Sequence, residues 1–159
     1  MKHLRTVFTC LAVAGLAACA SQPAPVSVAD TIARTPNLTT LNTLIVQAGM
    51  GEALKAQGPF TVFAPSNDAF KALPPAALAE LGKDPARLKA VLSYHVVPGK
   101  LNSTDIKNMT VKTIGGADLS LAKAGEFVTV DDAAVQTPDV AATNGVVHVI
   151  DQVLNAPRR

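Results

Sequence analysis

Beyond the first twenty residues, His95 and His148 are the side chains best suited to acid–base or metal chemistry, because an imidazole can exchange a proton or bind a metal near neutral pH. Each histidine lies among aliphatic residues that alternate as in a strand, in the runs 94–97 and 146–150. A zinc site needs three or four ligands, and the chain has neither an HExxH motif nor a close pair of histidines. The pattern favours two half-buried structural imidazoles in strands, each with one ring nitrogen bonded to the backbone.

Hydroxyl and carboxylate side chains give no stronger indication of catalysis. Ser66 and Ser93 could act as nucleophiles, but no G-x-S-x-G motif surrounds either of them. The acidic pair at 131–132, with Glu126, could suggest calcium, but its spacing lacks the ligand series of an EF-hand and favours a turn at a strand end. The sequence therefore predicts no catalytic residue, no metal and no cofactor. A hydrolase that uses either histidine stays open as an alternative.

The thiol of Cys19 is a candidate for covalent modification. Lys2 and Arg5 precede an apolar stretch, residues 7–18, that is too short to cross a hydrocarbon core of about 30 Å and is typical of an export signal. The stretch ends in Leu-Ala-Ala-Cys (16–19), which resembles the recognition site of bacterial lipoprotein signal peptidase. The resemblance implies that Cys19 receives diacylglycerol and becomes the N-terminus after removal of residues 1–18.

Two destinations follow from two interpretations of this cleavage site. Ala20 after the modified cysteine implies sorting to the outer membrane, with the protein facing the periplasm or the cell surface. The alternative is cleavage at an A-x-A site, residues 18–20, which would release a soluble periplasmic or secreted protein beginning at Ser21.

Composition limits the function of the exported chain. Lys2 and Arg5 account for two of the 14 basic residues, so 12 basic residues face 12 acidic ones after the signal, and nucleic-acid binding is not expected. The two cysteines, Cys10 and Cys19, both precede the folded part, which excludes disulfides, thiolate metal sites and a cysteine nucleophile there. About 130 residues suffice for one hydrophobic core, so a single domain is expected.

Residue patterns divide the exported chain into a short tether, a helical half and a strand-rich half. The Pro-rich segment 21–27 predicts an extended tether, and Ser27, Ser66 and Asp84 are suited to cap helices. Predicted helices cover 28–34, 38–48, 51–57 and 67–73, with a further helix that starts at Pro85, and a break is expected at Pro74-Pro75.

Strands are predicted where apolar residues alternate. The runs are 60–63, 94–97, 110–114, 119–122, 127–130 and 146–150. In the first run and the residue that follows it, Val62 and Ala64 face one side and Thr61 and Phe63 the other. Asn144-Gly145 predicts a tight hairpin turn with positive φ values. The order of helices and strands predicts an α+β fold with a largely antiparallel sheet.

Three segments resemble the motifs of the fasciclin domain (beta-Ig-H3/fasciclin) family. They are 61–70 (TVFAPSNDAF), 94–99 (YHVVPG) and 142–151 (ATNGVVHVID), in the family's order and spacing. The resemblance implies an antiparallel, β-sandwich-like wedge flanked by several short helices. It also implies an extracellular adhesion or interaction module, here as a single domain on a bacterial lipoprotein. Motif residues expected to be structural are Thr61, Phe63, Pro65, Asn67, Phe70, Tyr94, His95, Asn144, Gly145 and His148.

These observations combine into one organisation and one leading function. We expect a signal peptide at 1–18, a lipidated cysteine with an Ala/Pro tether at 19–26, a fasciclin domain at 27–155 and a tail at 156–159. The leading hypothesis is a non-catalytic adhesion or interaction module of the cell envelope, held to the membrane by its lipid, that binds an envelope or extracellular protein or polymer. A structural envelope protein without a dedicated ligand is a further alternative, and the oligomeric state is open.

One segment is a candidate contact for the partner. Pro138, Asp139 and Val140 resemble the Pro-Asp-Ile motif through which some animal fasciclin domains are proposed to engage integrins. The alternative is an edge strand, since proline cannot donate a hydrogen bond to a neighbouring strand and survives at sheet edges.

Overall fold

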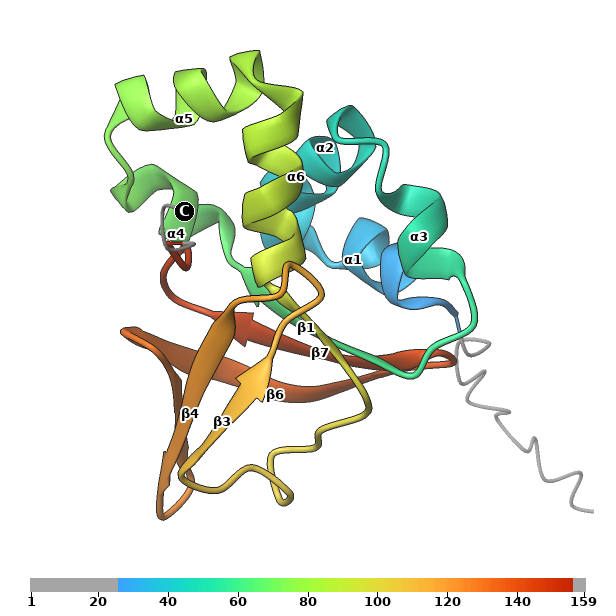
Figure 1. The fold of residues 1–159 in the computed structure, drawn as a ribbon, viewed down its shortest axis with the longest axis vertical. Helices are drawn as coiled ribbons and strands as arrows, with labels where there is room; N and C mark the ends of the chain where they lie inside the picture. Colours follow the sequence, from blue (N-terminus) through green and yellow to red (C-terminus); the bar gives the residue numbers. More distant parts are fainter. Residues whose placement is uncertain (1–25, 156–159) are drawn as a thin grey trace, which may run out of the picture.

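The computed structural model describes residues 26–155 (Figure 1). The predicted signal peptide at 1–18, the lipidation of Cys19 and nearly all of the tether at 19–26 lie outside these residues, as does the tail at 156–159. Within the described part, no helix has the length and apolar character needed to cross a membrane.

Helices dominate the first half of the described chain, and side-chain caps fix where several of them begin. Ser27 Oγ accepts a hydrogen bond from Asp30 N at the start of the first helix. Asp84 caps the last helix by accepting from Ala86 N and Arg87 N. The elements are α1 (Val28–Arg34), the 3-10 helix η1 (Pro36–Leu38), α2 (Thr39–Gln47), α3 (Gly51–Lys55), α4 (Asn67–Ala72), α5 (Pro75–Lys83) and α6 (Pro85–Tyr94).

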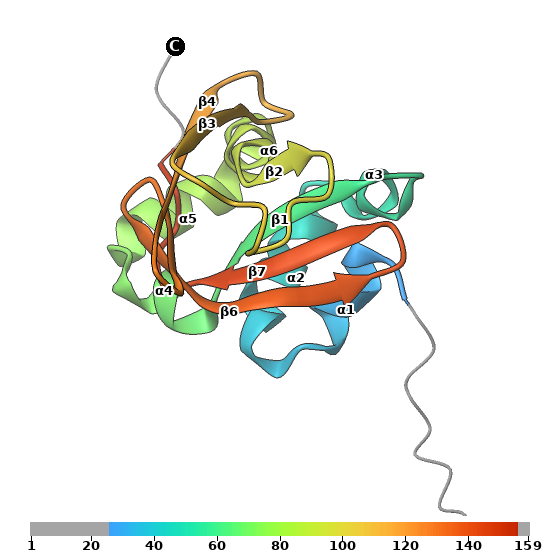
Figure 2. The same ribbon diagram turned by 90° about the horizontal axis from the view of Figure 1, so that it is seen from below.

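The strands form one curled sheet beside these helices (Figures 1 and 2). They are β1 (Phe60–Pro65), β2 (Val96–Pro98), β3 (Met109–Lys112), β4 (Asp118–Ala124), β5 (Phe127–Val130), β6 (Ala133–Ala142) and β7 (Gly145–Ile150). Within the described residues the order is β2-β1-β7-β6-β5-β4-β3, and every neighbouring pair is antiparallel except β1–β7. Ile114 N donates to Val96 O at 2.8 Å and nearly closes the sheet. The predicted α+β class is confirmed.

Strand β1 separates two hydrophobic cores, as its alternation predicts. Val62 and Ala64 pack in the core that lies under the helices, together with Phe70 from α4. Phe63 points to the opposite face and packs in the interior of the curled sheet. Strand β1 lies between β2 and β7 and has a core on each face, so residues 61–65 are all buried.

The prediction that Tyr94 and His95 lie in a strand is wrong. Tyr94 is the last residue of α6, and His95 is its C-cap, whose N–H lies 3.3 Å from Val91 O and 3.1 Å from Leu92 O. The helix continues through this segment because Leu88 and Leu92 bury one face of α6, and the strand β2 begins only at Val96.

The predicted helix break at Pro74-Pro75 is present, but a second helix follows it directly. Helix α4 ends at Ala72, as expected, but Pro75 then begins α5, which the sequence reading did not predict. A proline at the first helical position sacrifices no hydrogen bond, because that N–H has no partner inside the helix. The two prolines therefore separate two helices.

Strand β6 is not among the strands predicted from alternation, and its two ends pair differently. Ala133 and Ala134 pair with β5, whereas the register from Thr137 to Ala142 joins β6 to β7 alone. The register shifts on both sides of Thr137, so Pro138 and Asp139 fall in an irregular section of the strand. This section lies at an edge of the described sheet, as the presence of Pro138 indicated.

The expected positive φ values at Asn144-Gly145 are wrong. Ala142 pairs with Gly145, so the turn consists of Thr143 and Asn144, and none of these residues is among those with positive φ. Glycine is required at 145 for a different reason: a Cβ there would lie 1.9 Å from the carbonyl oxygen of Phe60. The glycine allows β7 to approach β1.

Candidate functional site

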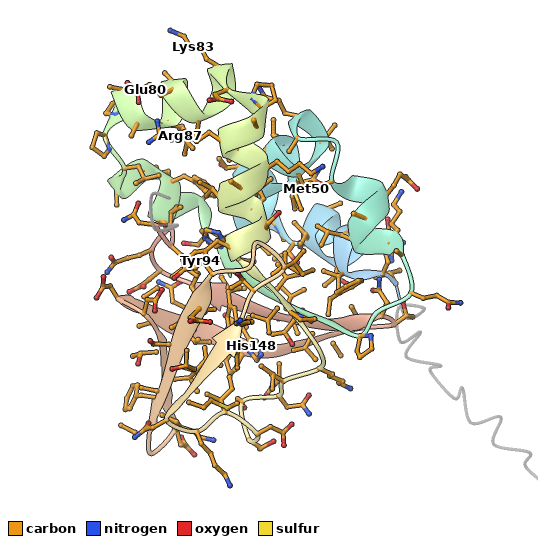
Figure 3. All side chains as sticks on the ribbon, in the orientation of Figure 1. Met50, Glu80, Lys83, Arg87, Tyr94 and His148 are labelled. Atoms are coloured by element: carbon orange, nitrogen blue, oxygen red, sulfur yellow. The ribbon has the colours of Figure 1, made fainter. Side chains whose placement is uncertain are left out.

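His148, one of the two histidines suited to acid–base or metal chemistry, is completely buried (Figure 3). It stands on β7, and its ring stacks on Phe63 with centroids 5.5 Å apart. Nε2 lies 2.8 Å from the carbonyl oxygen of Leu101 and therefore donates, whereas Nδ1 accepts from Asp139 N at 3.2 Å. Burial lowers the pKa of His148, against smaller opposing effects of the Leu101 bond and the Asp139 charge. The neutral imidazole thus joins β7 to two other segments.

Asp139 is the residue of the predicted contact segment with the most constrained geometry. Its φ is +56°, a left-handed conformation that aspartate and asparagine adopt more readily than most residues. Oδ1 accepts from Ser103 N at 2.7 Å, and Oδ2 accepts from Ser103 Oγ. Partial burial raises the pKa of Asp139, but the two bonds from Ser103, together with the nearby His148 and Lys123, lower it by a larger amount, and the net shift is downward. The exposed carboxylate is charged and held in a fixed direction.

The neighbours of Asp139 differ in exposure. Pro138 is exposed, and Val140 is half-buried and packs against the core under the helices. Lys123 Nζ donates to Ser103 O at 2.6 Å and adds a positive charge beside the Asp139 carboxylate. The segment 138–140 therefore presents one side to solvent and uses the other to hold the loop at 103 and the core.

His95 is also buried and also uses both ring nitrogens. Nδ1 donates to Val91 O at 2.8 Å, and Nε2 accepts from Leu154 N at 3.0 Å. Burial lowers the pKa of His95 to about 4, and the bond to Val91 opposes this shift only in part. The imidazole connects the end of α6 to the C-terminal segment. Both histidines are therefore more buried than the half-buried imidazoles predicted from sequence, and each bonds the backbone through two ring nitrogens instead of one.

Among the acidic residues that could suggest calcium, Asp131 has structural partners. Asp131 lies in the turn between β5 and β6 with φ +50°, and its Oδ2 accepts from Tyr94 Oη at 2.7 Å. Its Oδ1 accepts from Ser120 N at 3.0 Å. Burial, followed by this contact with Asp131, raises the pKa of Tyr94. Among the described residues, no cluster of three or more histidine, cysteine or acidic side chains is arranged to hold a metal.

The remaining motif residues connect elements that are distant in sequence. Thr61 Oγ1 donates to Gly99 O and accepts from Leu101 N. Asn67 Nδ2 donates to Pro36 O, and its Oδ1 accepts from Thr40 N, which ties α4 to α2. Pro65 pairs in register with Ile150 at the end of β1.

Asn144 makes the most far-reaching of these connections. Its Oδ1 accepts from Val28 N at 2.8 Å, so the turn between β6 and β7 is bonded to the start of α1. Its Nδ2 donates to Leu54 O and Ala56 O at 2.8 and 2.9 Å, which adds the end of α3. One asparagine side chain thus holds three segments together.

The site brings His148 and Asp139 together but leaves His95 and Asn144 elsewhere in the fold. It also contains a residue that sequence reasoning missed, Ser103, which lies 36 positions from Asp139 and gave no local signal. Ser66, considered as a nucleophile, caps α4 by accepting from Ala69 N and is buried. The arrangement supports positioning of an exposed charge rather than proton transfer.

Comparison with known proteins places these features in a family. The fasciclin domain matches residues 36–157 of this chain. Protein sll1483 of Synechocystis is 39% identical over 142 residues, which are 87% of this chain and 78% of that protein. Immunogenic protein MPB70 of Mycobacterium bovis is 34% identical over 84% of this chain and 69% of its own length.

Similarity extends to an animal protein and to a solved structure. Transforming growth factor-beta-induced protein ig-h3 of Sus scrofa is 40% identical over 71% of this chain, a region that is 17% of that protein. The structure of a FAS1 domain pair from the insect cell adhesion molecule Fasciclin I superposes with a TM-score of 0.61 at 25% identity, covering 76% of this chain and 46% of that one. The three motifs, the fold and these similarities agree: the chain belongs to the fasciclin domain family.

Proposed function

We propose that this protein is a lipid-anchored, non-catalytic interaction module of the cell envelope, which binds a protein or polymer partner. The main support for a non-catalytic role is that His95 and His148, the candidates for catalysis, each bond the backbone through both ring nitrogens. Neither ring has a free nitrogen to offer a substrate. The similarity to an insect cell adhesion molecule supports an interaction role.

Lipid anchoring at Cys19 is the first part of this proposal, and the Leu-Ala-Ala-Cys sequence supports it. Buried acyl chains contribute about 0.8 kcal/mol per CH₂, so a protein with two or more chains should sediment with membranes even in high salt. Cys19→Ala should move the protein to the soluble fraction. Intact mass should show a diacylglycerol-modified Cys19 as the N-terminus. An unmodified N-terminus at Ser21 would instead support the soluble alternative.

The partner contact at Pro138, Asp139 and Val140 is the second part. The exposed Pro138 and the fixed, charged carboxylate of Asp139 support it, because a pre-positioned charge binds without an ordering cost. We propose that the partner contacts the face of this segment that carries the carboxylate, since Val140 packs against the core.

Asp139→Asn tests the contact with little effect on the fold. Asparagine tolerates a positive φ, and its amide oxygen can still accept from Ser103 N. Its Nδ2 can donate to Ser103 Oγ, which reverses the bond that Oδ2 accepts in the wild type, so both contacts can be kept while the charge is removed. Binding to the envelope component that co-purifies with the wild type should weaken roughly tenfold or more, since hydrogen bonds to charged groups contribute about 1.5–3 kcal/mol. Asp132→Asn, which removes an exposed carboxylate from the β5–β6 turn, is the matched control.

Other results would favour the alternatives. Equal binding by the Asp139→Asn and Asp132→Asn proteins would exclude the segment as a charged contact. If no component co-purifies with the wild type at native abundance, a structural envelope protein without a dedicated ligand becomes the better description.

A further inference from the structure

The described chain begins at one end of the domain, next to the turn between β6 and β7. Val26 O accepts a hydrogen bond from Thr143 N at 2.9 Å, and Asn144 Oδ1 accepts from Val28 N. The start of the chain is therefore bonded to the turn between β6 and β7. Figures 1 and 2 show this turn beside the start of the coloured ribbon, with α3 next to it in Figure 1.

The same end carries a hollow of about 400 Å³ whose lining is fixed by backbone contacts. Phe60 N donates to Asn144 O, and a Cβ at Gly58 would lie 2.1 Å from that same oxygen. The loop before β1 and the β6–β7 turn are therefore in close contact. The lining comes from the loop at 57–59, from the β6–β7 turn with its flanking residues, 142–145, and from Lys100, which carries the only charge in it.

Lys100 projects from a backbone that is held on both sides. Gly99 N donates to Pro59 O at 2.9 Å, and Gly99 O accepts from Thr61 Oγ1 at 2.7 Å. Leu101 N donates to the same hydroxyl at 2.9 Å. The exposed Lys100 thus extends from a fixed backbone and contributes to the lining of the hollow.

The length of chain before Val26 limits how far this end can lie from a lipid on Cys19. Seven peptide steps separate the two residues, and even a fully extended chain of that length spans at most about 25 Å. Because the tether is short, the end of the domain to which it is attached stays near the bilayer. The tether therefore selects which end approaches the membrane.

We infer that the end formed by the β6–β7 turn, the Gln57–Pro59 loop and Lys100 lies against the membrane, where Lys100 contacts the phosphate of anionic phospholipid headgroups. The inference rests on the lipid anchoring proposed above. Acyl chains supply the affinity, and Lys100 supplies orientation. The neighbouring Lys55 adds little, because its Nζ lies 3.4 Å from Glu52 Oε1. The helices α4 and α5 then face away from the bilayer.

Fluorescence quenching in vesicles measures this orientation directly. The full-length lipoprotein is reconstituted into vesicles of phosphatidylcholine with phosphatidylglycerol that carry a nitroxide at the headgroup. A fluorophore is attached at Gln57→Cys or, as the matched control, at Lys83→Cys on the distant end of α5, which Figure 3 labels. The acylated Cys19 has no free thiol, and Cys10 leaves with the signal, so the introduced cysteine is the one that reacts.

Quenching at Gln57→Cys should be several-fold stronger than at Lys83→Cys. Lys100→Glu in the Gln57→Cys background should reduce that quenching in phosphatidylglycerol vesicles and leave it unchanged in pure phosphatidylcholine. Equal quenching at the two positions would overturn the orientation, and an unaltered signal in Lys100→Glu would overturn the headgroup contact. Flotation of the vesicles separates these results from failure of anchoring, because an unanchored protein stays at the bottom of the gradient.

Discussion

Acid should destabilise this domain in a pH range set by its buried histidines, and His95 allows the magnitude to be worked out. In the unfolded chain the imidazole takes up a proton near pH 6.5, whereas in the fold it stays neutral until about pH 4. Between these values the unfolded chain binds more protons, so the free energy of unfolding falls as the pH falls. The stability is fully present above pH 6.5 and is lost progressively toward pH 4.

The difference between the two pKa values corresponds to about 3 kcal/mol for His95 alone. His148 contributes in the same direction, since its pKa is also lowered by burial. Asp139 loses its proton more readily than an ordinary aspartate, so its titration falls below this range. The loss between pH 7 and pH 4 should therefore be dominated by the two histidines.

Urea unfolding of the Cys19→Ala protein at several pH values measures this loss, with His95→Gln as the comparison. Glutamine cannot titrate, so its profile should be flatter than the wild type by about 3 kcal/mol across the range, whatever its absolute stability. The NMR signal of the His95 ring should titrate near pH 4. A ring that titrates near pH 6.5, or parallel stability profiles for the two proteins, would refute the reasoning.

Three further changes test the contacts of the motif residues by urea unfolding. Gly145→Ala should lower the free energy of unfolding by more than about 3 kcal/mol, because its Cβ would lie 1.9 Å from Phe60 O. Gly125→Ala, at φ +64° in open space, should lower it by about 1 kcal/mol. Similar losses in the two variants would contradict the close-approach explanation. Asn144→Ala removes three hydrogen bonds to α1 and α3 and should cost about 2–4 kcal/mol, and a loss below about 1 kcal/mol would show that these bonds contribute little. Tyr94→Phe removes the hydroxyl bond to the β5–β6 turn and should cost about 1–2 kcal/mol, whereas Tyr94→Ala should cost about 3–5 kcal/mol, and equal losses would mean that the ring itself is not packed.

Local patterns determined much of the fold before any tertiary contact was known. The caps at Ser27, Ser66 and Asp84 start helices at the predicted places, because each cap satisfies N–H groups within three residues of itself. The alternation through Val62 and Phe63 correctly assigned the two faces of β1, since side chains on a strand point to opposite sides. These outcomes depend on neighbours along the chain.

Local patterns failed where a distant segment changed the balance. The run at Tyr94 and His95 has β-branched neighbours and resembles a strand, yet burial of α6 keeps Tyr94 helical. Gly145 was correctly singled out, but its reason is the carbonyl of Phe60, 85 positions away, and not the turn itself. Propensities of this size are overcome by packing, which a linear pattern does not contain.

The sequence by itself determined the family, the α+β class and the importance of His148 and Asn144. Only the tertiary structure decided what those residues do: it placed Ser103 against Asp139, occupied both nitrogens of each imidazole and bonded Val26 to the β6–β7 turn. Apart from the bonds that join His95 to Val91 and His148 to Asp139, these hydrogen bonds link segments 36 or more positions apart, and such bonds depend on sheet register and loop placement. Residue types fix which groups can bond, and the packed fold fixes which of them meet.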